Sequence, residues 1–416
     1  MIPRRPETVT RRRVGAPVLA RLLAGAALVA LSAPFTVTAP VTAAPAIRCT
    51  TPSQQLLPEV PWTHRRLAPQ RVWPLTRGDG VLVAVVDTGV DGAVPQLAGR
   101  VRRGVDVLTR GAFADDDCYG HGTFVAGIIA AQPAPGTGMV GLAPGARILP
   151  VRQAYGPTDG TTSGLARAIR AAVDGGASVI NVSASSFFPS DELRQAVEYA
   201  AEQDVLVVAA VANEAQQGNP TAYPAAYPEV LAVGAIGPDG RRSEFSEVGS
   251  YLDLVAPGVD VVSLSRGGIG HLVDSGTSYA TPFVAATAAL VRSYHPNLTA
   301  AQVKRRLERT ADHPGGKLPD PQVGWGVVNP YQAVTAILAE EHTRLAAPAG
   351  QPPIPPVAPP GGGPDHRSSA IEFSVTAAVL AGLVALLAYL IPLGTRRDWR
   401  SVGDSGDAPA RDGRAG

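Results

Sequence analysis

The chain has no excess of charge of either sign. Its 416 residues include 36 lysines and arginines and 35 aspartates and glutamates, which leaves a formal net charge of +1. A protein that binds nucleic acid carries a basic surface that contacts the phosphates, and we therefore expect no nucleic-acid partner. The sequence also lacks internal repeats and a recognisable calcium-binding loop. We expect no cofactor and no metal.

Cysteine is scarce, since only Cys49 and Cys118 occur. In an exported protein an even pair of cysteines favours a disulfide. The bond would close a loop of about 70 residues and contribute about 4 kcal/mol to stability in the chain-entropy treatment. It would tie an N-terminal arm to the segment around residue 118. Two free thiols are one alternative, and a reactive pair of Cys118 with His121, which a disulfide would rule out, is another.

The N-terminal residues 1–46 have the pattern of a secretory signal peptide. Arginines at positions 4, 5, 11, 12 and 13 precede the apolar run 22–33, and small residues follow at 41–46. This succession of a basic, an apolar and a small-residue region is typical of a cleaved export signal. The apolar run is too short to span a membrane comfortably. An uncleaved anchor is the alternative.

A second apolar segment lies near the C-terminus. Residues 371–391 contain one acidic residue, Glu372, and as a helix rising about 1.5 Å per residue they would be roughly 30 Å long, enough to cross a bilayer. Arginines follow at positions 396, 397 and 400. Positive residues mark the cytoplasmic side, so we expect a single-pass protein of the cell membrane with its tail in the cytoplasm and the rest outside. A buried core helix is the alternative, but the Pro- and Gly-rich stretch 346–365 before it is typical of an extended linker.

The middle of the chain, from about 73 to 340, alternates apolar runs of β type with helical stretches. Fully apolar strands that alternate with helices are typical of a parallel sheet covered by helices on both faces, so we expect an α/β fold. In such folds ligands bind at the carboxyl ends of the strands. The expected strands are 80–90, 146–154, 178–184, 205–214, 229–236 and 252–258, and the expected helices are 122–131, 164–176, 190–203, one that begins near 276, and 297–311.

Three polar residues stand where strands end or apolar helices begin. Asp87 ends the run VAVVD, His121 lies between two glycines at the start of an apolar helix, and Ser278 lies in GTSYATP at the start of another. Each alone has an ordinary structural explanation. These are an aspartate in a turn, a capping or satisfied histidine, and a serine that caps a helix, with Pro282 tolerated in the first turn.

Together these residues provide the groups that nucleophilic catalysis by serine needs. A serine hydroxyl is a poor nucleophile near neutral pH and requires a base within hydrogen-bond reach. The base in turn requires a carboxylate that fixes its tautomer and stabilises its charged form. We predict Ser278 as the nucleophile, His121 as the base and Asp87 as the carboxylate. No other histidine in the sequence has glycine on both sides.

Asn213 is the candidate for stabilising the oxyanion. It stands at the end of the strand expected over 205–214. From there its side-chain N–H can donate to the developing negative charge, beside the backbone N–H of Ser278. Taken alone, Asn213 fits an ordinary turn residue equally well.

The segments VAVVDTGV, GHGTFVAGIIA and GTSYATPFVAA resemble the three catalytic blocks of subtilisin-like serine proteases, which carry aspartate, histidine and serine in this order. Residues 223–236 and 245–263 are also similar to that family, and the resemblance covers about 73 to 340. It implies a three-layer fold with a mostly parallel sheet of about seven strands between helices. It also implies endopeptidase activity through an acyl-enzyme.

The flanking segments resemble those of the mycosins, the membrane-anchored proteases of actinobacterial type VII secretion systems. The similarity rests on the export signal, the short arm with Cys49, the segment DDDCYGHGT with Cys118, the Pro-rich linker and the single membrane span. It implies that the arm wraps the catalytic domain, and that subunits of a secretion membrane complex are candidate partners beside protein or peptide substrates. The arm is also too short for the foldable prodomain that is usual in secreted subtilisins.

The chain departs from the subtilisin pattern near the expected substrate path. The motif Ser-x-Gly of many subtilisins reads Ser183-Ala184-Ser185 here, and the glycine before the oxyanion asparagine is Ala212. We expect residues 183–185 to bind substrate. The added methyl groups predict a narrower cleft and slow or selective cleavage. The acidic run 115–117 offers carboxylates for a cation, but we favour a solvated acidic turn.

Three functions fit these patterns. The first is a protease that processes exported proteins at the outer face of the membrane, and the second is a structural subunit of a secretion complex with proteolysis secondary. The third, a free digestive subtilisin, is disfavoured by the membrane span and the short arm. The expected organisation is a signal peptide (1–46), an N-terminal arm (47–72), a peptidase domain (73–340), a linker (341–369), a transmembrane helix (370–392) and a cytoplasmic tail (393–416).

Overall fold

The structure is a computed structural model that describes residues 49–342 and the helix α9 (His366–Thr395). These residues fall into two units, which separate between Leu338 and Ala339. The signal peptide expected over 1–46 lies outside the described residues, as do most of the expected linker and tail.

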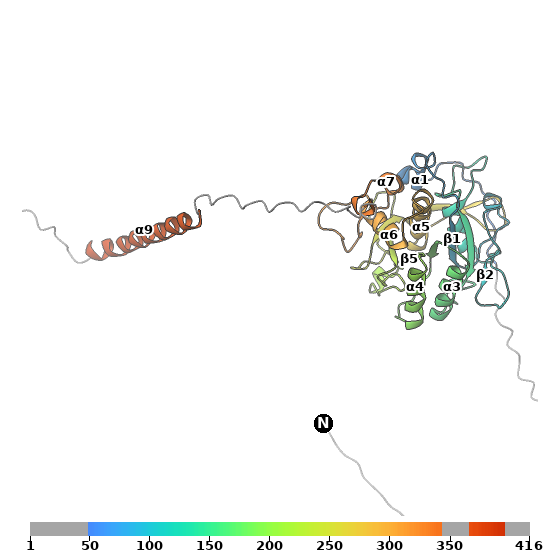
Figure 1. Cartoon of the computed structure of the whole chain (residues 1–416), viewed down its shortest axis with the longest axis horizontal. Coiled ribbons are helices and arrows are strands. Elements are labelled where there is room, and N and C mark those ends of the chain that lie inside the picture. The colour runs from blue at the N-terminus through green and yellow to red at the C-terminus, as the bar shows by residue number, and fades with distance from the viewer. Residues whose placement is uncertain (1–48, 343–365, 396–416) are drawn as a thin grey trace, which may run out of the picture. The chain divides into compact units, whose positions relative to one another are not determined.

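The first unit is built on one parallel sheet. Its strands are β1 (Leu82–Asp87), β2 (Val105–Asp106), β3 (Arg147–Arg152), β4 (Val179–Val182), β5 (Leu206–Ala210), β6 (Leu231–Ile236) and β7 (Leu254–Pro257). They form a seven-stranded sheet in the order β2-β3-β1-β4-β5-β6-β7, in which every pair of neighbours is parallel (Figure 1). Nearly every strand residue is buried, as fully apolar strands require. The parallel α/β fold expected from the sequence is confirmed.

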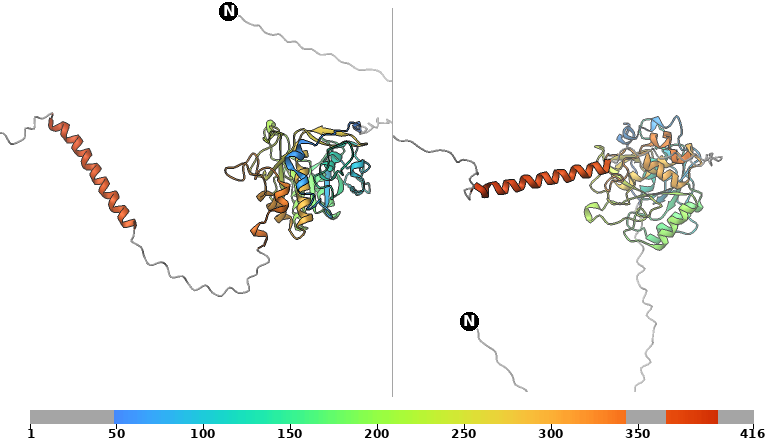
Figure 2. Two further views of the ribbon diagram at one scale, coloured as in Figure 1. Left: turned by 90° about the horizontal axis from the view of Figure 1, so that it is seen from above. Right: turned by 60° about the vertical axis from the view of Figure 1, so that its left-hand side comes forward.

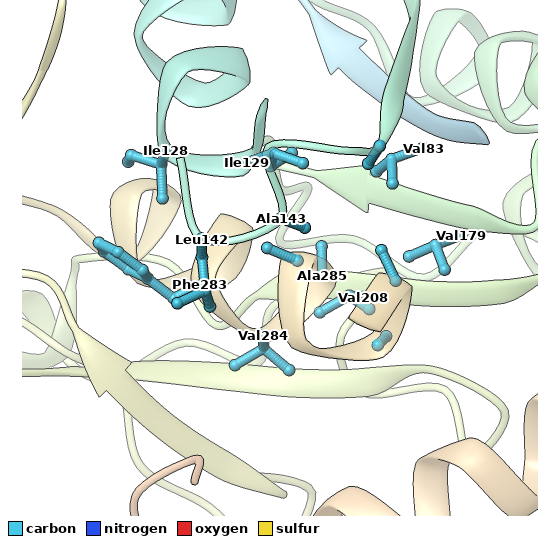
Figure 3. Close-up of a cluster of buried hydrophobic side chains, with 14 of the residues drawn as sticks. Val83, Ile128, Ile129, Leu142, Ala143, Val179, Val208, Phe283, Val284 and Ala285 are labelled. Atoms are coloured by element: carbon cyan, nitrogen blue, oxygen red, sulfur yellow. The ribbon is translucent and has the colours of Figure 1, made fainter. Parts of the chain in front are cut away.

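Helices cover both faces of the sheet. They are α1 (Trp62–Leu67), α2 (His121–Ala130), α3 (Thr162–Asp174), α4 (Asp191–Glu202), α5 (Thr277–Tyr294), α6 (Ala300–Arg309) and α7 (Pro330–Thr335), whereas the short helix α8 (Ala339–His342) belongs to the second unit. Successive side chains of a strand point to opposite faces. In β1, Val83 and Val85 therefore pack in the core that contains α2 and α5, whereas Ala84 and Val86 pack in the core that contains α3 and α4. Figure 3 shows the first of these cores, with side chains of α2 and α5 gathered against the strands.

Sequence patterning located the long elements and missed some of the short ones. Each expected strand and helix is present, with ends that differ by a few residues. The missed elements include β2, which has only two residues, and the antiparallel pair β8 (Val261–Leu264) and β9 (His271–Asp274). A strand of two residues, such as β2, is too short to show a periodicity.

The N-terminal arm lies along the β8–β9 hairpin. The backbone N–H of His271 in β9 donates to Gln55 at 2.8 Å, and the N–H of Ser53 donates to the hydroxyl of Ser265 at 2.9 Å. A Cβ on Gly270 would lie 2.1 Å from the carbonyl oxygen of Ser53, so the close approach of the arm to the hairpin requires glycine at position 270. The arm thus adds backbone hydrogen bonds to the exposed edge of the hairpin.

The disulfide expected between Cys49 and Cys118 is present, with the two Cα atoms 4.4 Å apart. Next to it, the N–H of Thr50 donates to the carbonyl oxygen of Cys118 at 3.0 Å. The arm is therefore joined covalently to the segment that precedes α2.

The second unit contains α9, a continuous helix of 30 residues (Figures 1 and 2). It includes the segment 370–392, for which the sequence predicts a helix. Among the described residues, no helix combines the length and the apolar character needed to cross a membrane. Whether α9 spans a bilayer stays a prediction.

Candidate active site

The carboxyl edge of the sheet brings the three predicted catalytic residues together. Asp87 is the last residue of β1, His121 is the first of α2, and Ser278 is the second of α5. Nδ1 of His121 lies 2.7 Å from Oδ1 of Asp87, and Nε2 of His121 lies 3.1 Å from Oγ of Ser278. The ionised carboxylate can only accept, so Nδ1 carries the proton and Nε2 is the acceptor for the serine hydroxyl. This is the arrangement that an activated serine nucleophile needs.

Two opposing effects set the proton affinity of His121. Burial is the largest single effect and lowers its pKa, but the charge of Asp87, the hydrogen bond to it and the charges of Asp117 and Asp274 together raise the pKa more. The net result is a pKa above the ordinary value of 6.5. His121 is therefore a stronger base than a free imidazole.

Asp87 is held in a defined orientation. Its side chain is buried, and Oδ1 also accepts a hydrogen bond from the backbone N–H of Thr88 at 2.8 Å. Its Oδ2 has no hydrogen-bond partner among the residues that the structure describes. A buried carboxylate of this kind is well placed to stabilise the imidazolium that forms when His121 takes up a proton.

The start of α5 differs from the expected capping serine. The helix begins at Thr277, and the hydroxyl of Ser278 points to His121 and does not cap the helix. The capping acceptor is Oδ1 of Asn213, which accepts from the backbone N–H of Thr277 at 2.9 Å and from its hydroxyl at 3.0 Å. Because the amide oxygen of Asn213 is occupied in this way, its NH₂ group is left to donate elsewhere. Asn213 and Ser278 line the same cleft.

Pro282 is the sixth residue of α5. It therefore lies beyond the first turn of the helix, whereas the sequence analysis placed it within that turn. In a helix interior the missing N–H of proline leaves the carbonyl oxygen four residues earlier without its partner. That oxygen belongs to Ser278, and it accepts a hydrogen bond from the hydroxyl of Ser183 at 3.0 Å. The hydroxyl of Ser183 therefore forms a hydrogen bond with the backbone of α5, although Ser183 also lines the cleft.

The triad opens onto a cleft of about 580 Å³. Ser183, Ala184 and Ser185, for which substrate binding stays a prediction, line it together with residues between Gly156 and Thr162. None of the described arm residues lines the cleft. Phe187 and Phe188 also line it, and Phe188 is 78% exposed. The sequence analysis did not single out these two aromatic side chains, although they directly follow the predicted substrate segment.

Ala212 is not placed as the sequence analysis expected. It is only 5% exposed and does not line the cleft, so its methyl group does not narrow the substrate path. Its φ of 74° lies in the left-handed region, which costs a residue with a Cβ about 1 kcal/mol. Of the two positions where glycine is replaced, only Ser185 lines the cleft, so any narrowing by an added side chain falls to that residue.

The acidic run 115–117 is not a solvated turn throughout. Asp116 forms an ion pair with the buried Arg152, and Asp117 is only 3% exposed. Both carboxylate oxygens of Asp117 accept hydrogen bonds from residues at the start of α2. Among the described residues, no group of three or more histidines, cysteines or acidic residues is arranged to hold a metal ion. Asp117 is a further residue near the site that sequence reasoning missed, because a run of three acidic residues is typical of a solvated loop.

The fold and the hydrogen-bonded triad define a serine peptidase of the subtilisin type. The chain belongs to the subtilase family, whose profile (Peptidase_S8) matches residues 78–326. It is 41% identical to the Thermophilic serine proteinase of Bacillus sp. (strain AK1), over 63% of this chain and 64% of that protein, so it matches less than two thirds of the length of this relative.

The chain is also similar to mycosins. It is 35% identical to Mycosin-3 of Mycobacterium tuberculosis (strain ATCC 25618 / H37Rv), over 78% of this chain and 82% of that protein. Among solved structures, it is similar to that of a serine protease MycP1, described as an essential component of the type VII (ESX-1) secretion system. The TM-score is 0.61 at 33% identity, with 69% of this chain and 92% of that chain covered.

Proposed function

We propose that the chain is a serine endopeptidase that acts outside the cytoplasmic membrane and cleaves one or a few exported proteins of a type VII secretion system. The observation that carries the proposal is the hydrogen-bonded series from Asp87 through His121 to Ser278 at the wall of an open cleft. The similarity to Mycosin-3 and to the ESX-1 component supports the secretion context.

The geometry gives each residue a step in the reaction. Nε2 of His121 takes the proton of Ser278 as Oγ attacks the scissile carbonyl. The resulting oxyanion accepts from the NH₂ group of Asn213 and from the backbone N–H of Ser278, which has no intrahelical acceptor because it lies in the first turn of α5. His121 then gives its proton to the leaving amine, and water attacks the acyl-enzyme in a second round with the same groups.

The selectivity of cleavage follows from the wall of the cleft. Ser185 stands where the Ser-x-Gly segment of many subtilisins has glycine, and it lines the cleft together with Phe187 and Phe188. Side chains that project into a cleft restrict which substrates fit. This supports cleavage of few sequences over broad digestion.

We propose further that α9 anchors the peptidase in the membrane with the tail in the cytoplasm. The support is the apolar segment 371–391 and the arginines that follow it. The full chain should stay with the membrane fraction after extraction with alkaline carbonate, and a chain that ends at residue 342 should be released. Release of the full chain by the same treatment would exclude a membrane span.

The activity is tested by labelling with a fluorophosphonate probe, which reacts only with an activated serine. The full-length chain should be labelled, and the variant Ser278→Ala should not. Absence of labelling of a folded wild-type protein would overturn the proposed peptidase activity.

A second function, a structural subunit of the secretion complex, is favoured by the description of the similar MycP1 as an essential component of its system. This function predicts that a strain with Ser278→Ala still secretes, whereas a strain without the protein does not. Loss of secretion in both strains would leave proteolysis as the required activity.

A further inference from the structure

Asp117 stands outside the triad but contacts both segments that build it. Its carboxylate is buried and accepts four hydrogen bonds. Oδ2 accepts from the backbone N–H of Thr123 at 2.9 Å and from its hydroxyl at 2.7 Å. Oδ1 accepts from the N–H of Gly120 at 2.8 Å and from the hydroxyl of Thr88 at 2.9 Å.

These four donors come from two parts of the site. Gly120 and Thr123 bracket His121 at the N-terminus of α2, where backbone N–H groups lack intrahelical acceptors and attract negative charge. Thr88 belongs to the turn after β1, and its own N–H donates to Oδ1 of Asp87. One carboxylate therefore binds the residue next to the catalytic aspartate and the residues on either side of the catalytic histidine.

Thr88 closes the connection between the two segments. Its hydroxyl donates to Asp117 and accepts from the backbone N–H of Gly122, which directly follows His121, at 3.1 Å. The turn after β1 and the first turn of α2 are thus joined by hydrogen bonds between buried groups. Such bonds are costly to break, because the remaining partners would stay buried and unsatisfied.

We propose that Asp117 is a positioning residue, which holds the N-terminus of α2 against the turn after β1 and so sets the alignment of His121 with Asp87. The proposal rests on the peptidase function proposed above. Asp117 does not touch the reacting serine, and it acts through the backbone that carries the other two members of the triad.

Burial raises the pKa of Asp117, while the hydrogen bonds from Gly120 and Thr123 lower it. In its ionised form, which the four donors favour, Asp117 supplies a readout that a purely structural role would not move. The groups that face His121 are Asp87, Asp117 and Asp274, which all raise its pKa, and Ser278 and Tyr279, whose ring centroid lies 5.2 Å from that of the imidazole. Removing the charge of Asp117 therefore lowers the pKa of His121. The pH below which activity is lost then falls as well.

The experiment compares full-length wild type with Asp117→Asn and with Asp115→Asn. Asp115 lies in the same acidic run, but its side chain is 40% exposed and pairs with Arg103 at 3.7 Å. It is therefore the matched control. The rate constant of fluorophosphonate labelling is measured between about pH 5 and 9. We expect Asp117→Asn to lower the rate by about 10²-fold, as misplacement of a catalytic group does, and to move the acid limb to lower pH. Asp115→Asn should change neither.

Labelling of Asp117→Asn at the wild-type rate, with an unmoved acid limb, would overturn the proposal. If Asp117→Asn does not fold, the variant Thr88→Val tests the proposal instead. It removes the hydroxyl that joins Asp117 to the N–H of Gly122 and leaves every charge in place. This variant should label slowly with an unmoved acid limb, and labelling at the wild-type rate would overturn the proposal.

If the wild type itself is not labelled, the proposed peptidase function fails. The pKa of His121 measured by NMR then tests the inference separately, since an equal pKa in wild type and Asp117→Asn would overturn it.

Discussion

The hydroxyl of Ser183 donates to the carbonyl oxygen of Ser278 at 3.0 Å. That oxygen lacks its helical partner because Pro282, four residues further along α5, has no N–H. Ser183 in turn accepts a hydrogen bond from the side-chain amide of the buried Asn181 at 2.8 Å. The loop that follows β4 therefore holds the backbone of the predicted nucleophile.

Replacement of Ser183 by alanine should destabilise the protein and slow catalysis. The lost hydrogen bond leaves the carbonyl oxygen of Ser278 unsatisfied, which costs about 1 kcal/mol. Urea denaturation of Ser183→Ala measures this loss. In the Pro282→Ala background an N–H is restored to the helix, so the same replacement should cost less. An equal cost in both backgrounds would contradict the proposed link to Pro282.

Activity should fall as the pH drops through the pKa of His121. Protonation removes the lone pair of Nε2 that accepts the serine proton. Because Asp87 raises this pKa above 6.5, half of the activity should already be lost at a pH above that value. The measurement is the pH dependence of kcat/KM for a peptide substrate or of fluorophosphonate labelling. An acid limb centred below 6.5 would show that burial, which lowers the pKa, is the stronger effect.

Two variants of Asn213 should separate its two roles. Asn213→Asp keeps the oxygen that caps Thr277 but loses the NH₂ donor, so it should retain most of its stability while kcat falls by about 10²-fold or more. Asn213→Ala loses the cap as well, and it should be less stable by about 1 kcal/mol in addition. Thermal unfolding and labelling rates measure the two effects. Equal unfolding temperatures for the two variants would show that the cap contributes nothing.

Glu247 should make the free energy of unfolding depend on pH. It is fully buried, and burial together with the charge of Glu214 raises its pKa from 4.5 to about 7. The folded state thus holds a proton that the unfolded state releases, so stability should decrease as the pH rises from 4.5 to 7. The full effect is on the order of 3 kcal/mol.

The variant Glu247→Gln should remove this part of the pH dependence and be more stable than wild type at pH 8. Glu308, whose pKa burial also raises to about 7, adds a dependence of the same sign that remains in the variant. Replacement of the exposed Glu198 by glutamine is the control. Urea denaturation at about pH 5 and pH 8 measures the difference, and parallel losses in wild type and Glu247→Gln would refute the assignment.

The disulfide should stabilise the fold without taking part in catalysis. Replacing both Cys49 and Cys118 by alanine removes the constraint on a loop with a sequence separation of 69 residues, which is worth about 4 kcal/mol in the chain-entropy treatment. The unfolding temperature should fall, whereas the labelling rate at low temperature should be kept, because Asp117 holds the start of α2 by its own hydrogen bonds. An unchanged unfolding temperature under oxidising conditions would mean that the arm is held by its other contacts.

Much of the fold could be predicted from the sequence because strongly apolar strands alternate with helices of clear periodicity. The same pattern placed Asp87, His121 and Ser278 at the ends of elements that meet at one edge of the sheet. Predictions of this kind need only the element type and the direction of the strands.

The remaining details depend on contacts that no local pattern records. The burial of Asp117 depends on Thr88, which lies 29 residues earlier, and the hydroxyl of Ser183 is used by a carbonyl group 95 residues away. Ala212 is buried and does not line the cleft, and it has a left-handed backbone conformation, which the sequence does not reveal for alanine. The position of Pro282, in contrast, could have been predicted, because a helix that begins near residue 276 puts Pro282 beyond its first turn.

The covalent bond between Cys49 and Cys118 encloses β1 and Asp87 in a closed ring of chain. A single peptide-bond cut in any surface loop of that ring would leave both pieces attached to one molecule, and the segment with the aspartate could not diffuse away. The ring would keep a molecule cut in this way in one piece, which the hydrogen bonds of the arm alone would not do.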